Sequence, residues 1–241
     1  MIKRILLIIG IILLALIVMT IVYGGKRYRR RISADTLEKR RRLAFGAVLC
    51  GRNNMSYTDL YDASNIDRRS ALNALDEHWG VTDHHSAIRI LDWLKCGGHH
   101  DHSYDSIYRQ LIGQNGDIEV SQTAANSFRN ACEVLIKDFG YTQKELTELG
   151  TVSAWDYDRL VWLARICQGV GFISAEQAWA YIADAADAGS EDYNDWRSYF
   201  AGVLLGRAIW SDDEQFPQDD RDIAKSLIMD KNSIYYQVPF K

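Results

Sequence analysis

The chain has 241 residues, of which 47% are hydrophobic and 11% aromatic, and it carries a formal net charge of −4 at pH 7. This composition supplies enough apolar surface for a folded core, so a chain that is disordered throughout is excluded. The four cysteines are scattered singly and there are only two prolines, which excludes a disulfide-rich scaffold and a proline-rich linker.

The charges are unevenly distributed along the chain. Residues 1–42 contain eleven basic and two acidic residues, a net charge of +9, whereas the remaining residues carry a net charge of −13. An acidic body behind a short basic segment is not the pattern of a folded domain with a basic nucleic-acid-binding face. We therefore expect no nucleic-acid partner.

Residues 5–23 form an uninterrupted apolar stretch. They contain no charged residue and consist mainly of Ile, Leu and Val. At about 1.5 Å per residue, a helix of this length matches the ~30 Å hydrocarbon layer of a bilayer. A cleaved signal peptide is the alternative, but the stretch exceeds the usual ~7–15 apolar residues and ends in Tyr23-Gly24-Gly25 rather than in a small-x-small cleavage site. Residues 1–25 are therefore interpreted as a transmembrane anchor.

The basic residues on either side of this stretch predict its orientation. Lys3 and Arg4 precede it, whereas residues 26–42 carry nine Lys or Arg residues. The side richer in Lys and Arg normally stays in the cytoplasm. The pattern predicts a single-pass protein whose basic juxtamembrane segment, residues 26–42, and C-terminal domain, residues 43–241, are cytoplasmic.

The rest of the chain carries repeated signals for the starts of helices. Polar capping residues, several of them followed three positions later by Glu or Gln, precede apolar positions at helical spacing. These signals predict helices over residues 35–52, 67–80, 83–97, 191–210 and 221–229, and further helices that begin near residues 142, 153 and 174. Residues 117–121 alone show the alternation of a strand. We expect an all-α domain of about eight to ten helices.

The histidines are confined to one part of the chain. All six lie between positions 78 and 102, and Cys96 lies among them. Cys96, His99, His100 and His102 are of the types that bind Zn²⁺ or another divalent metal, although their spacing matches no standard zinc motif. The alternative is a polar loop after Gly97-Gly98. Apart from this possible metal site, no motif predicts a cofactor.

A second group of charged residues is distributed over three predicted helices. Asp156 and Arg159 are three positions apart and can pair on one helix. Glu176 lies in the first turn of another helix, and Arg207 follows an apolar stretch, where an arginine is either a buried ion-pair partner or an anion ligand. Together with His99, these residues are candidates for a catalytic cleft. The alternative is a set of ion pairs that hold the helices together.

Several short motifs resemble one family. They are Trp79-Gly80-Val81, Leu91-Asp92-Trp93-Leu94, Gly98-His99, Ala154-Trp155-Asp156 with Arg159, Gly171-Phe172-Ile173 with Glu176, Ala178 and Trp179, and finally Trp196, Tyr199, Gly206-Arg207 and Trp210. In this order they resemble the bacterial domain-of-unknown-function family 1266 over about residues 75–210. The family pattern often has Gly-His-Arg where this chain has Gly98-His99-His100. The resemblance implies an all-α bacterial domain, sometimes membrane-linked, with no settled activity, and places the predicted anchor in a bacterial inner membrane.

Three functions remain open at this point. The first, favoured because no catalytic signature is found, is a membrane-tethered interaction module that binds a protein partner through an aromatic or acidic face, in envelope stress, competition or defence. The second is a hydrolase or transferase in which His99 is the acid or base and arginine holds an anionic group. The third is a metal or pH sensor built on the histidine segment.

Overall fold

A computed structural model describes residues 32–33, 36–61, 67–99, 103–113, 119–211 and 217–241. The predicted transmembrane stretch, residues 5–23, and two of the predicted metal ligands, His100 and His102, lie outside these ranges. Within these ranges, no helix has both the length and the hydrophobicity needed to cross a membrane.

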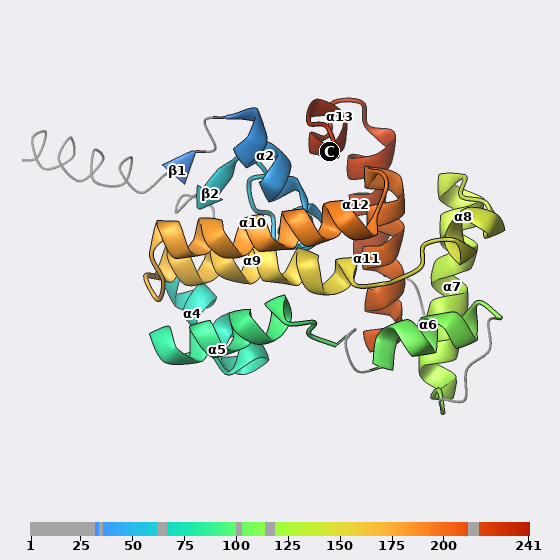
Figure 1. Ribbon diagram of the computed structural model, residues 1–241, viewed down its shortest axis with the longest axis horizontal. Coiled ribbons are helices and arrows are strands. Elements are labelled where there is room, and N and C mark those ends of the chain that lie inside the picture. The colour runs from blue at the N-terminus through green and yellow to red at the C-terminus, as the bar shows by residue number, and fades with distance from the viewer. Residues whose placement is uncertain (1–31, 34–35, 62–66, 100–102, 114–118, 212–216) are drawn as a thin grey trace, which may run out of the picture.

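The all-α fold class is confirmed for the described part of the chain, which contains more helices than the eight to ten expected (Figure 1). Its helices are α2 (Leu37–Ala44), α3 (Ala47–Arg52), α4 (Arg68–Trp79), α5 (His84–Lys95), α6 (Asp105–Leu111), α7 (Gln122–Phe139), α8 (Gln143–Thr147), α9 (Ala154–Val170), α10 (Ala175–Asp192), α11 (Trp196–Trp210), α12 (Gln218–Ala224), the π-helix η2 (Lys225–Met229) and α13 (Ile234–Gln237). Two very short strands, β1 (Ile32–Ser33) and β2 (Asp59–Tyr61), pair antiparallel.

Helix α9 lies at the centre of the domain. Fifteen of its seventeen residues are buried, and it contacts α3, α4, α5, α10, α11 and β2. Figure 1 shows α10 running alongside α9, with α4 and α5 on one side of this pair, α2 on the other, and α11 crossing near one end. Because α9 is enclosed on all sides, its four charged residues, Asp156, Asp158, Arg159 and Arg165, are buried and need polar partners.

The helix predicted over residues 35–52 is divided into α2 and α3. The break falls at Gly46, where a Cβ atom would overlap the side chain of Val161 on α9. Beyond the break, the carboxylate of Asp158 accepts hydrogen bonds from the backbone N–H groups of Val48 at 3.0 Å and Leu49 at 2.9 Å. The close packing of Gly46 against α9 and the two hydrogen bonds to Asp158 together determine where α3 begins and in which direction it runs.

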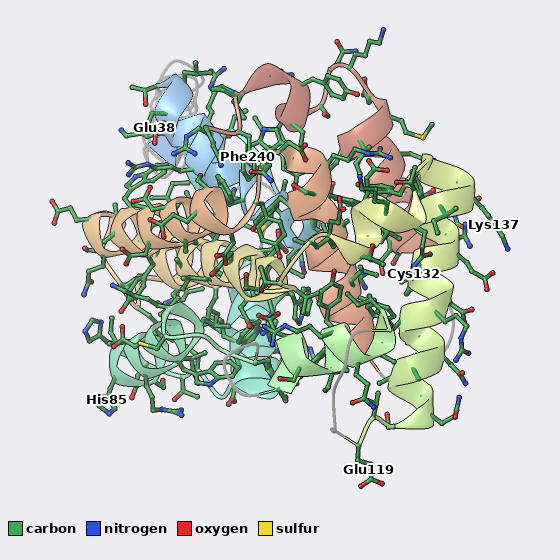
Figure 2. All side chains as sticks on the ribbon, turned by 45° about the vertical axis from the view of Figure 1, so that its right-hand side comes forward. Glu38, His85, Glu119, Cys132, Lys137 and Phe240 are labelled. Carbon is green, nitrogen blue, oxygen red and sulfur yellow. The ribbon has the colours of Figure 1, made fainter. Side chains whose placement is uncertain are left out.

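The C-terminal residues are an integral part of the same core. Trp196, at the start of α11, stacks on Tyr235 with ring centroids 4.6 Å apart and donates its indole N–H to the carbonyl of Val238. Phe240 packs against Phe45, and Figure 2 shows it close to α2. The C-terminal residues are thereby packed against the start of α11 and the end of α2.

Two helix boundaries differ from the sequence prediction. The helix expected over residues 191–210 begins at Trp196, because Asp195 accepts a hydrogen bond from the Ser198 N–H and caps it there, while Glu191 belongs to α10. The helix expected over residues 221–229 begins at Gln218 and changes from α12 into the π-helix η2 after Ala224.

Candidate functional site

A cavity of about 650 Å³ lies among helices α3, α4, α5, α9 and α11. Its volume is in the range of pockets that hold small organic molecules. Five of the seven tryptophans of the chain line it: Trp79, Trp93, Trp155, Trp162 and Trp210. We call this cavity the tryptophan pocket.

One face of α9 forms a wall of the pocket and supplies three of its lining residues. Trp155, Arg159 and Trp162 are spaced by four and three positions, so they lie along the same side of the helix. Trp155 and Trp162 are 4% and 6% exposed, and neither indole N–H has a hydrogen-bond partner among the described residues. The wall therefore holds two unsatisfied donors, which is uncommon for buried polar groups.

The guanidinium of Arg159 lies among three of the tryptophan rings. Its central carbon is 4.8 Å from the ring centroid of Trp155 and 5.9 Å from those of Trp79 and Trp93. These distances are typical of cation–π contacts, which strengthen when the pair is desolvated. Burial lowers the pKa of Arg159 to about 9, so the guanidinium keeps its charge at neutral pH.

Among the described residues, the hydrogen bonds of Arg159 leave one nitrogen of its guanidinium without a partner. Its Nη2 donates to Oδ1 of Asp156 and to Nδ1 of His99, the latter at 2.8 Å, and its Nε donates to the carbonyl of Trp155 at 3.3 Å. Its Nη1 makes no hydrogen bond with any residue of the described ranges. A guanidinium held in this way is positioned to bind an acceptor on its remaining side.

The carboxylate of Asp156 joins Arg159 to the loop that follows α5. Asp156 is 1% exposed, and its Oδ2 accepts a hydrogen bond from the backbone N–H of His99 at 3.0 Å. The preceding residue, Gly98, has a φ of +51°, and a Cβ atom there would lie 2.6 Å from the carboxyl carbon of Asp156. Two motifs that are far apart in sequence, Gly98-His99 and Asp156-Arg159, thus form one cluster.

His99 is neutral in this arrangement. Because its Nδ1 accepts from Arg159, the proton of the ring is assigned to Nε2. Burial, and next the positive charge of Arg159, lower the pKa of His99 to about 4. The ring also meets Trp93 edge-on, with centroids 4.8 Å apart. At neutral pH, His99 therefore contributes a neutral ring with one engaged nitrogen.

A second group of charges forms another part of the lining. Arg52 of α3 and Arg207 of α11 both line the tryptophan pocket, and both contact the buried carboxylate of Asp220 on α12. The Arg207 Nη1 is 2.9 Å from Oδ2 of Asp220. The sequence left Arg207 as either an ion-pair partner or an anion ligand, and its position is compatible with both roles.

The candidate cleft residues separate into two sets. His99, Arg159 and Arg207 line the tryptophan pocket, and Asp156 lies directly behind Arg159. Glu176 is exposed in the first turn of α10 and does not line it.

The metal-site prediction stays a prediction. Cys96 is exposed at the C-cap of α5, whereas His99 belongs to the cluster with Arg159. Within the ranges that the structure describes, no three His, Cys, Asp or Glu side chains are grouped as metal ligands would be.

Sequence reasoning missed part of the lining. Trp162 could have been found, because its helical spacing from Trp155 and Arg159 places it on the same face. Arg52 and its partner Asp220 are separated by 168 positions, and no local pattern connects them.

A family model described as "Protein of unknown function (DUF1266)" matches residues 74–240. The chain belongs to this family. The match includes the pocket residues of α5, α9 and α11, whereas Arg52 and the rest of α3 precede it.

One relative is the "Uncharacterized protein YbeR" of Escherichia coli (strain K12). It is 34% identical to this DUF1266 protein over 71 residues, which is 30% of this chain. The matched part spans 28% of the length of YbeR. No solved structure matches the chain.

Proposed function

We propose that this DUF1266 domain binds a small organic anion in the tryptophan pocket. The observation that carries the proposal is the chemistry of the lining. Three arginines and five indole rings line the pocket, and these groups only donate hydrogen bonds. No described lining residue supplies a carboxylate. A ligand rich in acceptors and carrying negative charge is the complement of such a surface.

The same lining favours binding over hydrolysis or group transfer. The described lining residues include no hydroxyl, thiol or amine, so the imidazoles of His78 and His99 are the remaining candidates for a nucleophile or an acid–base group. His99, the candidate acid or base, already uses Nδ1 to accept from Arg159. The arrangement therefore supports a receptor-like role more strongly than the hydrolase or transferase hypothesis.

Two of the exposed aromatic side chains that an interaction module would require line this pocket, whereas a third, Tyr236, which is 58% exposed, does not. Trp93 is 37% exposed and Trp210 is 50% exposed, and both line it. Their exposure is accounted for by a ligand that enters between them. The interaction-module hypothesis then takes a specific form. A protein partner recognises the ligand-bound domain, which is tethered through the anchor predicted from residues 5–23 and their basic flank.

The proposal is tested with the full-length protein in lipid nanodiscs. Thermal unfolding is followed in the presence of aromatic carboxylates, sulfonates and phosphates, and of amines built on the same rings. Anions of at least one class are expected to raise the Tm, because a ligand that binds only the folded state stabilises it. Equal stabilisation by the matched amines, or no stabilisation by any anion, would contradict the proposal.

Matched variants locate the binding. Arg159→Lys keeps the charge but removes the Nη1 donor and the bonds that hold it in place, so it is expected to abolish the anion-dependent rise in Tm. Arg197→Lys is the control, since Arg197 also lies over an aromatic ring, Tyr141 at 3.7 Å, but does not line the tryptophan pocket. An equal loss in both variants would place the anion elsewhere.

A further inference from the structure

We infer that the ligand of the tryptophan pocket is a flat aromatic compound with a single carboxylate, held with its carboxylate at Arg159 and its rings between the indoles. This inference rests on the proposed function and names the class of ligand. It follows from the placement of Arg159, from the charge already beside it and from the nature and size of the walls.

The placement of Arg159 provides a fixed donor for an acidic group such as a carboxylate. The guanidinium is fixed by its bonds to Asp156, His99 and the backbone of its own helix, and its Nη1 branch makes no hydrogen bond within the described ranges. A carboxylate is planar and can accept from the guanidinium in that plane. Binding of a ligand costs little side-chain entropy at Arg159, because Asp156 and His99 already order its guanidinium.

The charge beside Arg159 selects a monoanion. The carboxylate of Asp156, which is 1% exposed, is hydrogen-bonded to the same guanidinium. Any acid that binds Arg159 therefore comes close to a negative charge that is screened little by water. A phosphate monoester brings about −1.5 to −2 charges at neutral pH, whereas a carboxylate brings one. Asp156 therefore repels a carboxylate ligand less than it repels a phosphate monoester.

The walls select an aromatic body of more than one ring. Trp93 and Trp210 provide exposed ring surface at the rim, and Trp155 meets Trp210 with centroids 5.9 Å apart. Aromatic rings in such surroundings gain from offset and edge-on contacts beyond the burial of area. The cavity of about 650 Å³ is in the range of pockets for drug-sized ligands, larger than a single benzoate ring.

The experiment uses four probes of one shape on the full-length protein in lipid nanodiscs. They are 2-naphthoate, the neutral 2-naphthamide, the dianionic 2-naphthyl phosphate and the saturated decahydro-2-naphthoate. Binding is followed by ¹⁹F NMR after incorporation of 5-fluorotryptophan, with each resonance assigned by a Trp→Phe variant. Trp179 and Trp196 do not line the pocket and serve as internal controls.

The expected result is that 2-naphthoate shifts the resonances of the pocket tryptophans and leaves those of Trp179 and Trp196 in place. Loss of a charge-assisted hydrogen bond corresponds to at least about a tenfold change in Kd, so 2-naphthamide should bind at least tenfold more weakly. The phosphate and the saturated acid should also bind more weakly than 2-naphthoate.

Each other outcome overturns a defined part of the argument. Tighter binding of 2-naphthyl phosphate or of decahydro-2-naphthoate overturns the ligand class but leaves an anion pocket. Equal binding of 2-naphthamide overturns the anion pocket itself. If none of the four probes binds, the inferred ligand class is wrong. The wider panel of aromatic carboxylates, sulfonates and phosphates then tests whether the pocket binds an anion.

Variants separate the acid contact from the ring contact. Arg159→Lys should weaken 2-naphthoate at least about tenfold and leave 2-naphthamide unchanged. Trp93→Leu and Trp210→Leu alter exposed side chains, so the fold should tolerate them, and both should weaken 2-naphthoate and 2-naphthamide alike. Unchanged 2-naphthoate binding in Trp93→Leu and Trp210→Leu would contradict the inference even if Arg159→Lys failed to fold.

Discussion

Gly98 lies directly against the carboxylate of Asp156, so that a Cβ atom on Gly98 would stand 2.6 Å from the carboxyl carbon. This contact brings the loop after α5 onto α9 and places His99 beside Arg159. The tryptophan pocket therefore depends on a residue without a side chain at position 98.

Gly98→Ala is expected to destabilise the domain and disturb the pocket. The φ of +51° alone costs an alanine about 1–2 kcal/mol, and the overlap with Asp156 adds to this cost. The free energy of unfolding is measured by denaturant titration. Gly80→Ala is the control, because Gly80 has a φ of +60° and nothing within 4 Å of the added Cβ. Equal losses in the two variants would show that the contact with Asp156 contributes nothing.

His99 is expected to make the folded domain less stable in acid. Burial and the charge of Arg159 lower its pKa to about 4 from an ordinary value near 6.5. The unfolded chain therefore binds the proton more readily than the folded domain does. The stability contributed by neutral His99 is present above pH ~6.5 and is lost as the pH falls toward 4.

The measurement is the free energy of unfolding between pH 7 and pH 4 for the unaltered chain and for His99→Gln. The variant should show a shallower decline with falling pH, because it lacks this titrating group. His85→Gln is the control, since His85 is exposed on the outer side of α5 (Figure 2). Parallel pH profiles for the unaltered chain and His99→Gln would contradict the assignment.

The sequence predicted elements and local pairs but not the contacts between distant segments. The pairing of Asp156 with Arg159 follows from a spacing of three on a helix, and the structure contains it. The bond from the His99 N–H to Asp156 spans 57 positions, and the special role of Gly98 is visible only when α9 is in place. Helix propensity likewise does not reveal the break at Gly46, which results from Val161 on another helix.

Helix α7 shows a different limit of sequence reasoning. It begins after Ser121, whose side chain accepts from the Ala124 N–H, but Ala124 cannot complete a capping box. The Glu or Gln that marked the starts of several other helices was therefore missing here.

Asp220→Asn is expected to destabilise the domain by ~3–5 kcal/mol, the usual cost of removing one partner of a buried ion pair. Asp220 is 1% exposed and contacts both Arg52 and Arg207, so its charge holds α3, α11 and α12 together. The free energy of unfolding is compared with that of Asp222→Asn, a change on the exposed side of α12. A loss no larger than in Asp222→Asn would show that the buried carboxylate contributes no net stability.

Arg165→Lys is expected to cost ~3 kcal/mol or more, because several hydrogen bonds from one charged group are lost together. Arg165 is 1% exposed, and its guanidinium donates to the carbonyls of Leu60 at 3.0 Å and Asp59 at 2.6 Å. An ammonium group cannot reproduce this planar set of donors. Thermal unfolding of Arg165→Lys is compared with that of Arg197→Lys, whose side chain is 35% exposed. Similar Tm values for the two variants would contradict the prediction.

The membrane anchor predicted from residues 5–23 is tested by fractionation. The full-length protein should stay in the membrane pellet after alkaline extraction, and a chain that begins at residue 32 should not. A double variant, Leu13→Arg with Leu14→Arg, should also leave the pellet, because each arginine at the centre of a spanning helix costs about 2.5–3.5 kcal/mol. Leu13→Ile with Leu14→Ile is the matched control and should stay in the pellet. Retention of the double arginine variant in the pellet would place the membrane attachment elsewhere in the chain. The orientation is tested separately: digestion of a C-terminal tag by protease added outside spheroplasts would contradict the cytoplasmic orientation.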